Sequence, residues 1–178
     1  MTHHKSLIPL FFFTICLACN TNGEKESIDY GTAKISNARQ EINAREHHNF
    51  TCEKRTEENP FGNFTELELD ENELRFTNIE SSLFEGRTIN FKINKMLNIS
   101  EVSYNEWIDV IHNDRTEKYK VVESGINLNI DPFKTEGQEL VADYYLKVKH
   151  TTDFKWSWNK DVNYFIVTGR FKCNKNMW

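Results

Sequence analysis

From residue 47 onward, apolar and polar residues alternate with a period of two in several separate stretches. Successive side chains of a strand point to opposite faces of a sheet, so this period is typical of strands with one buried and one solvated face. The pattern therefore predicts an all-β domain over residues 47–178. The apolar positions of the alternating stretches are Phe50 and Cys52; Leu67 and Leu69; Leu74 and Phe76; Ile89, Phe91 and Ile93; Ile126, Leu128 and Ile130; Ala142, Tyr144, Leu146 and Val148; Phe165, Val167 and Phe171.

Two polar stretches inside this pattern predict turns. Residues 70–72 separate two alternating stretches, and Ser124-Gly125 separates two others, so we expect a hairpin at each position. One stretch departs from the period of two. Ser103 and Glu106 stand three residues apart and resemble the capping box that opens a helix, so we expect one short crossing helix over residues 104–112.

The number and spacing of the alternating stretches decide between architectures. About eight short strands with one-sided alternation are typical of antiparallel sheet, either as a sandwich or as a partly or fully closed barrel. Gly62-Asn63-Phe64 leads into the stretch around Leu67, where lipocalins carry Gly-x-Trp. With Phe in place of Trp, this is an analogy of architecture to a lipocalin-like barrel.

A different pattern occupies the first nineteen residues. Lys5 is followed by an almost unbroken apolar run over residues 7–17, and then by Ala18 and Cys19. A basic start, an apolar run and small residues form an export signal, and this run is too short to span a bilayer as a permanent helix. The cysteine after Leu17-Ala18 resembles the lipobox of bacterial lipoproteins, with Cys16 where the family usually has Leu.

The resemblance to bacterial lipoproteins implies a location. Residues 1–18 would be the signal peptide, and Cys19 would become the acylated N-terminus that anchors the chain in a membrane of the bacterial cell envelope. Asn20, not aspartate, follows the cysteine, which implies delivery to the outer membrane under the best-known sorting rule. An ordinary secretory signal cut nearby and a single N-terminal membrane helix are the alternatives.

Residues 19–46 are expected to be a lipidated polar tether between the anchor and the β domain. Tyr30 is the only aromatic residue in this segment. Apolar residues fall at helical spacing over about residues 33–46, so a short helix is expected there. Such a narrow apolar stripe would be marginal as an isolated helix.

Cys52 and Cys173 are the thiols that remain once the leader is removed and Cys19 is acylated. Export places them in an oxidising space, where two remaining thiols often pair. Each follows a phenylalanine by two residues, so in strands each Phe and Cys would share a face. The sequence therefore predicts a Cys52–Cys173 disulfide that joins the first and last strands of the domain. Two buried free thiols are the alternative.

The charged residues are unevenly distributed. Residues 19–139 carry 14 Lys and Arg against 24 Asp and Glu, whereas residues 140–178 carry 7 against 3. The acidic excess of the larger part does not fit a nucleic-acid partner. The asymmetry fits either two oppositely charged sides of one sheet or a basic edge that meets an acidic partner.

Motifs of catalysis and cofactor binding are missing from the sequence. It has no nucleophile elbow, no phosphate-binding loop and no dinucleotide fingerprint. His47 and His48 lack the spacing of a zinc-binding helix, because adjacent side chains diverge on a helix or a strand. The sequence therefore singles out no catalytic residue, no cofactor and no metal ligand, although an enzyme with a dispersed site stays an alternative.

The strongest candidate for ligand binding is the stretch Phe154-Lys-Trp-Ser-Trp158. In an extended chain, Phe154, Trp156 and Trp158 would share one face and form a platform for a sugar ring, an apolar ligand or a protein. Tyr145 is a fourth candidate contact. Alternatively, these rings close one end of the core.

These observations predict an envelope lipoprotein with a non-catalytic binding role. Its ligand would be a small apolar molecule or a glycan. The alternative is a protein–protein interaction module, such as an envelope assembly factor or an inhibitor. The membrane, reached through the lipid anchor, is a further expected partner.

Overall fold

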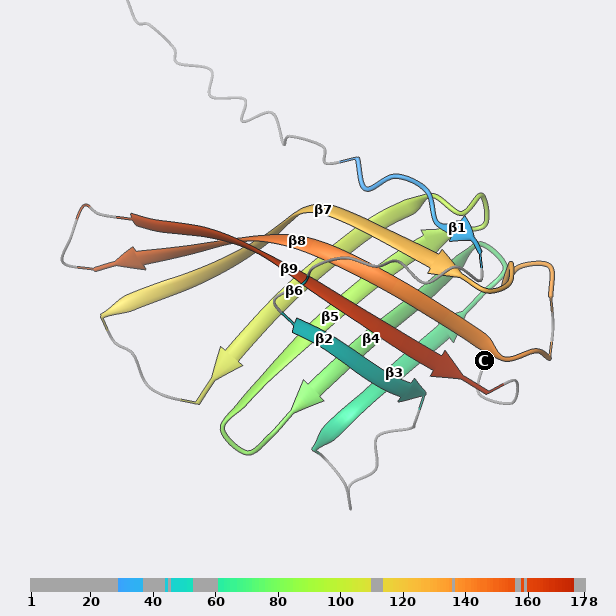
Figure 1. The fold of residues 1–178 in the computed structure, drawn as a ribbon, viewed down its shortest axis with the longest axis horizontal. Helices are drawn as coiled ribbons and strands as arrows, with labels where there is room; N and C mark the ends of the chain where they lie inside the picture. The colour runs from blue at the N-terminus through green and yellow to red at the C-terminus, as the bar shows by residue number, and fades with distance from the viewer. Residues whose placement is uncertain are drawn as a thin grey trace, which may run out of the picture.

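The computed structural model describes residues 29–36, 44, 46–52, 61–109, 114–135, 137–155, 158 and 160–174. Every regular element in these ranges is a β-strand, so the predicted all-β class is confirmed (Figure 1). The strands are β1 (Lys34–Ile35), β2 (Glu46–Cys52), β3 (Gly62–Leu69), β4 (Glu73–Ser81), β5 (Glu85–Asn94), β6 (Ile99–Ile108), β7 (Arg115–Leu128), β8 (Leu140–Phe154) and β9 (Lys160–Cys173).

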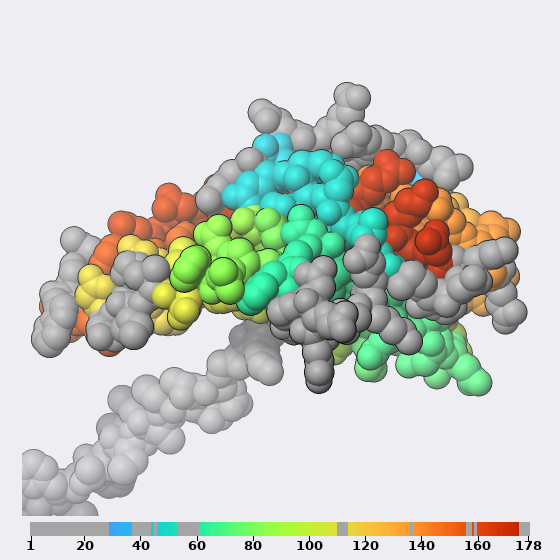
Figure 2. All heavy atoms as spheres, turned by 90° about the horizontal axis from the view of Figure 1, so that it is seen from below, coloured from blue at the N-terminus to red at the C-terminus, as the bar shows by residue number. Residues whose placement is uncertain are grey.

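All nine strands belong to one mixed sheet in the order β1-β7-β8-β9-β2-β3-β4-β5-β6, which curls into a half-barrel. Strand β2 joins two antiparallel blocks, because it runs parallel to both β9 and β3. Figure 2 shows β2 in cyan beside the red β9 and the green β3. The predicted antiparallel sandwich is therefore wrong: β2 hydrogen bonds to both blocks, so they share a sheet instead of stacking face to face.

A segment at the start of the described chain joins the two edges of the curled sheet. We call residues 29–36 the strap. On one side the Ala33 N–H donates to the carbonyl of Leu97, between β5 and β6, at 2.7 Å. On the other side β1 pairs with the end of β7, and the Ser36 N–H donates to the Leu128 carbonyl at 2.8 Å. The strap thus bridges the β6 and β7 edges at one end of the half-barrel.

The core lies on the concave face of the sheet and is built around aromatic rings. Phe76 contacts Phe91, Phe171 and Tyr144, with ring centroids 4.8, 4.4 and 6.4 Å away. These four side chains come from β4, β5, β9 and β8, and each is at most 2% exposed. Burial of such large rings is the main favourable term that holds the two antiparallel blocks together.

The predicted disulfide is confirmed. Cys52 on β2 and Cys173 on β9 are bonded, with their Cα atoms 4.7 Å apart and a sequence separation of 121. Phe50 lies opposite Phe171 in the same pair of strands, and both rings are buried beside the sulfur atoms. Strand β2, near the start of the domain, and β9, its last strand, are therefore direct neighbours, as the predicted disulfide required.

The expected crossing helix over residues 104–112 is wrong in the part that the structure describes. Residues 104–108 belong to β6, and residues 110–113 lie outside the described ranges. The two supposed capping residues make sheet contacts instead: Ser103 accepts from the Asn90 amide at 2.9 Å, and Glu106 accepts from the Tyr104 hydroxyl. Pairing with β5 along the whole strand overrides the local helix signal.

The two predicted hairpins have different outcomes. The β3–β4 turn forms at residues 70–72, where the Asp70 carboxylate accepts two backbone N–H bonds that lower its pKa. The Ser124-Gly125 turn is wrong, because both residues continue β7 past an irregularity after Val121. Gly125 instead lets the ring of Tyr145 on β8 pack directly against the β7 backbone, because a Cβ at residue 125 would collide with that ring.

The leader and most of the tether cannot be compared with these predictions. Residues 1–28, including Cys19, and residues 37–43 lie outside the described ranges. Within the expected helix over residues 33–46, Lys34 and Ile35 form the extended strand β1. Within the described ranges, no helix has the length and apolar character needed to cross a bilayer.

Candidate functional site

The concave face changes from apolar to polar along the strands. Near the strap it is filled by the aromatic core, whereas toward the β4–β5 turn the same face carries ionisable side chains. On β5, for example, Arg87 continues the inward register of Ile89, Phe91 and Ile93. We call these inward ionisable side chains the polar layer. Its members are Glu46, His48, Glu80, Arg87, Glu106, Glu117 and His150.

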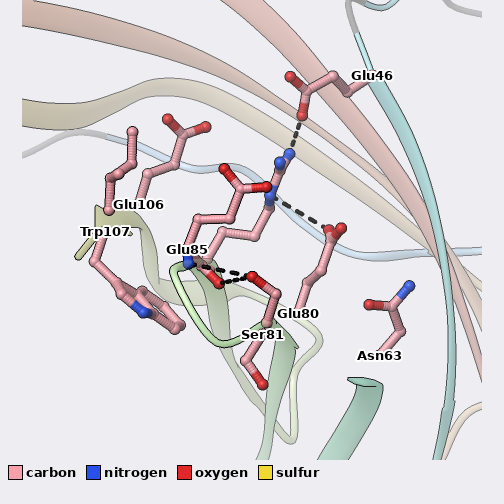
Figure 3. Close-up of a pocket in the computed structure, with 11 residues that line it drawn as sticks. Glu46, Asn63, Glu80, Ser81, Glu85, Glu106 and Trp107 are labelled. Atoms are coloured by element: carbon pink, nitrogen blue, oxygen red, sulfur yellow. Dashed lines mark hydrogen bonds and ion pairs between the residues drawn. The ribbon is translucent and has the colours of Figure 1, made fainter. Parts of the chain in front are cut away.

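Arg87 is the centre of one half of the polar layer. Its guanidinium donates to Glu46 on β2 and lies 3.3 Å from Glu80 on β4, as the dashed lines in Figure 3 show. His48 completes the group, with Nδ1 3.0 Å from Glu80 and Nε2 3.0 Å from the Arg87 guanidinium. Side chains from β4, the neighbour of β5 in its hairpin, and from β2, which is distant in sequence, therefore converge on one cation.

Replacement of Arg87 is expected to destabilise the fold. Arg87→Leu would leave Glu46 and Glu80 close together on a partly dry face without their shared cation. Because all three side chains are 21–32% exposed, we expect a loss of about 1–3 kcal/mol, below the range for fully buried pairs. Urea unfolding measures the loss. Lys92→Leu, which breaks only the more exposed pair with Glu101, is the matched control, and equal midpoints for the two variants would contradict the role of Arg87.

The other half of the polar layer combines carboxylates with aromatic rings. The Tyr104 hydroxyl donates to Glu106, and the Tyr119 hydroxyl donates to Glu117 at 3.0 Å. Glu117 also lies 3.2 Å from His150, whose ring stacks on Tyr119 with centroids 4.7 Å apart. These hydrogen-bonded side chains cover one end of the aromatic core.

Three of the tyrosines in and under the polar layer hold their protons more tightly than usual. Burial raises the pKa of Tyr104 and of Tyr119, and the Glu106 carboxylate raises both further. Burial also raises the pKa of Tyr144, which is 2% exposed. A neutral hydroxyl is the form that can donate to Glu106 and Glu117, so ionisation would break these bonds.

These raised pKa values predict a loss of stability in alkali. The tyrosines of the unfolded chain ionise near pH 10, whereas those of the folded chain keep their protons to a higher pH. The stability that these neutral tyrosines contribute is therefore complete below about pH 10 and declines as the pH rises above it. Urea midpoints measured from about pH 8 to about pH 11 should fall. The urea midpoint should fall less steeply with pH in the triple variant Tyr104→Phe/Tyr119→Phe/Tyr144→Phe than in the wild type. In the exposed control Tyr164→Phe it should fall as steeply as in the wild type. An equal decline in both variants would contradict the assignment.

A pocket of about 280 Å³ lies beside Arg87. Its polar walls include Glu46, Glu80, Glu85 and Glu106, and Figure 3 shows Glu106 and Trp107 projecting from β6 in opposite directions. Trp107 lies over Gly86, where a Cβ would collide with the indole ring. The other lining residues are Asn63, Ser81, Ser82 and Ile108.

The rim of this pocket is apolar and exposed. Leu83 and Phe84 form the β4–β5 turn, and each is about two-thirds exposed. The end of β6, with Trp107 and Ile108, lies beside this turn, because the Asp109 N–H donates to the Phe84 carbonyl, and these two consecutive strand residues point to opposite faces. Exposed apolar side chains around one edge of a sheet, beside a pocket, are typical of an interaction site. We call these four side chains the apolar rim.

The predicted ligand-binding residues do not line this pocket. Phe154 is half-buried at the end of β8, and Trp158 is fully exposed in the β8–β9 turn. Tyr145 lies on the opposite face of β8 from Phe154, where its hydroxyl donates to Glu123 at 3.1 Å. Trp156 lies outside the described residues. The alternation along β8 thus separates Tyr145 from the rest of the predicted platform.

Sequence reasoning missed the pocket, although one signal was present. Arg87 and Glu80 occupy positions that the alternation along β5 and β4 assigns to the buried face. A charged residue in a buried register needs a partner, and this need indicates a polar site. The partners Glu46 and His48 lie on β2, whose place beside β3 and β9 the local pattern does not specify.

The described side chains do not suggest a metal centre. Within the described ranges, no group of three His, Cys, Asp or Glu side chains is placed to hold a metal ion. Around Glu46, His48 and Glu80, the guanidinium of Arg87 already supplies the positive charge. The group therefore offers hydrogen-bond acceptors next to a fixed cation.

Comparison with models of known protein families, with curated proteins and with solved structures finds no match to this chain.

Proposed function

We propose that the chain is a non-catalytic binding protein of the bacterial cell envelope. Acylated Cys19 anchors it in the outer membrane, and the pocket beside Arg87 holds one sugar unit of a glycan. The observation that carries the proposal is the chemistry of the pocket walls: carboxylates, an amide, hydroxyls and a guanidinium, with one indole ring at the side.

The pocket walls favour a polar ligand over an apolar one. An apolar ligand would strip water from Glu46, Asn63 and Ser81 without replacing their hydrogen bonds, at a high cost in free energy. Sugar hydroxyls can donate to the carboxylates and accept from the amide, while an apolar part of the neighbouring glycan unit contacts Trp107 at the edge of the pocket. A volume of about 280 Å³ is just below the range of about 300–1,000 Å³ for drug-sized ligands, which fits a single sugar unit.

The ion pairs around Arg87 support binding rather than turnover. Glu46 and Glu80 both contact the guanidinium and His48, so their orientation is set before a ligand arrives. Each carboxylate can accept more hydrogen bonds than Arg87 and His48 supply. Pre-oriented acceptors lower the entropy lost on binding.

Tryptophan fluorescence titrated with a panel of soluble oligosaccharides tests this proposal. Trp107→Ala should weaken binding about 10-fold, because an aromatic contact is typically worth about 0.5–1.5 kcal/mol beyond the area it buries. Trp158→Ala is the matched control, since it removes an exposed tryptophan that does not line the pocket. Loss of binding in Trp158→Ala with full binding in Trp107→Ala would move the site to the β8–β9 turn, as the aromatic stretch of the sequence suggested.

A protein partner is the second candidate, and the apolar rim favours it. Leu83 and Phe84 are each about two-thirds exposed, and they lie beside the acidic pocket. A protein that covers the rim would bury them and could place a basic side chain against Glu85. The double variant Leu83→Ser/Phe84→Ser should then abolish cross-linking to an envelope protein while leaving sugar binding intact.

A further inference from the structure

His48 is the most enclosed side chain of the group around Arg87. It is 11% exposed, against 21–32% for the three residues that it contacts. It projects from β2 onto the concave face, the same face as Phe50, whose ring centroid lies 6.1 Å away. His48 does not itself line the pocket, so any effect that it has on a ligand acts through the residues that it contacts.

The contacts of the His48 ring assign its protonation state. A guanidinium can only donate hydrogen bonds, so Nε2, which lies 3.0 Å from an Arg87 nitrogen, accepts and carries no proton. The proton of the neutral ring is then on Nδ1, which lies 3.0 Å from the Glu80 carboxylate and donates to it. Arg87 also donates to Glu46, so the ring, the guanidinium and both carboxylates are held in one arrangement. The structure therefore corresponds to a neutral His48 with its proton on Nδ1.

A second proton on the His48 ring would break this arrangement. A protonated Nε2 could no longer accept from Arg87, and two cations would lie 3.0 Å apart. The new N–H would instead face Glu46, whose carboxylate lies 3.2 Å from Nε2. Protonation thus turns His48 from a partner of Arg87 into its competitor for Glu46. Because Glu46 and Arg87 both line the pocket, the pocket walls would change with it.

The surrounding strands bring further ionisable side chains to the concave face. They are Glu85 on β5, Tyr104 and Glu106 on β6, Arg115, Glu117 and Tyr119 on β7, and Tyr144 and His150 on β8. The Tyr144 hydroxyl lies over Gly169, the residue of β9 opposite His48, and burial raises the pKa of Tyr144, so it is neutral below about pH 10. Among the described residues, Arg87 is the only cation in contact with His48. A charged ring would therefore act on Arg87.

We propose that His48 is the positioning residue of the pocket. In its neutral form it holds Arg87 and Glu46 where they bind the glycan, and its protonation separates them and weakens binding. The inference rests on the proposed function for the nature of the ligand. Histidine is the side chain that changes its charge around neutral pH, so the chain would bind its glycan at neutral pH and release it in acid.

Nitrogen-15 NMR of the ligand-free full chain in detergent tests the switch itself. The ring signals of His48 are assigned by their loss in His48→Gln. We expect a proton on Nδ1 alone at about pH 7.5 and on both ring nitrogens at about pH 5.5, with a shift of the Arg87 Nε signal that follows the ring. A proton on Nε2 of the neutral ring, or an Arg87 signal that does not follow the ring, would overturn the proposal.

Titration with the oligosaccharide panel at the same two pH values tests the consequence for binding. The wild type should bind about tenfold more weakly at the lower pH, as expected for the loss of one hydrogen bond to a charged group. His48→Gln keeps a donor for Glu80 and an acceptor for Arg87 but cannot gain a proton, so it should bind equally at both pH values. His47→Gln is the matched control, because His47 points to the opposite face of β2 and contacts Thr168. It should keep the wild-type difference.

The two measurements separate the role of His48 from the proposed function. A loss of binding in acid that persists in His48→Gln would assign the pH effect to the pocket carboxylates and contradict the proposal. If no oligosaccharide binds at either pH, the proposed function fails, whereas the NMR signals of the wild type still decide whether the ring controls Arg87. The same signals decide this if His48→Gln does not fold.

Discussion

The double variant Cys52→Ser/Cys173→Ser is expected to lose about 4–5 kcal/mol of unfolding free energy relative to the oxidised protein. The bond closes a loop with a sequence separation of 121 residues, and a long closed loop removes much conformational entropy from the unfolded chain. Urea unfolding monitored by circular dichroism measures the loss. Since a domain of this kind has about 5–15 kcal/mol in total, the variant should be close to unfolding at body temperature.

The reduced wild-type protein is the control for the disulfide prediction. It keeps both sulfur atoms in the core but lacks the covalent link, so its midpoint should match that of the serine variant. A reduced protein as stable as the oxidised one would show that the β2–β9 pairing holds without the bond. The structural reason to expect otherwise is that β2 has only seven residues and joins the two antiparallel blocks.

Phe76→Ala is expected to cost about 3–5 kcal/mol. The ring is 1% exposed and contacts Phe91, Phe171 and Tyr144, so its removal leaves a cavity where strands from both blocks meet. Phe84→Ala is the matched control, because that ring is 68% exposed and its loss should change stability by less than about 0.5 kcal/mol. Similar losses for the two variants would contradict the assignment of the core.

Strand positions were predictable from the chain because alternation is a local property. The stretches around Leu67, Phe76, Phe91 and Leu146 all lie in strands, and the β3–β4 turn forms at residues 70–72. The disulfide was predictable for a different reason. The expectation of export would place the two remaining thiols in an oxidising space, where thiols often pair, and each cysteine shares a buried face with a phenylalanine.

The errors at residues 104–108 and 124–125 have a common physical cause. Ser103 and Glu106 fit a capping box, and Ser124-Gly125 fits a turn, when only their neighbours in sequence are considered. In the sheet, β5 pairs with β6 and β8 pairs with β7 along these segments. The free energy of long-range pairing exceeded the small local preferences in both places.

Neighbouring residues in the chain thus decided which segments became strands, where the first hairpin turned and which sulfur atoms were available to bond. The tertiary structure alone decided that β2 runs parallel to both its neighbours, that one curled sheet forms instead of a sandwich, and that Glu46, Glu80 and Arg87 meet. Glu46 and Arg87 are 41 residues apart, and no local pattern encodes which strands become neighbours. That choice depends on burying one shared set of aromatic rings, which is a property of the whole chain.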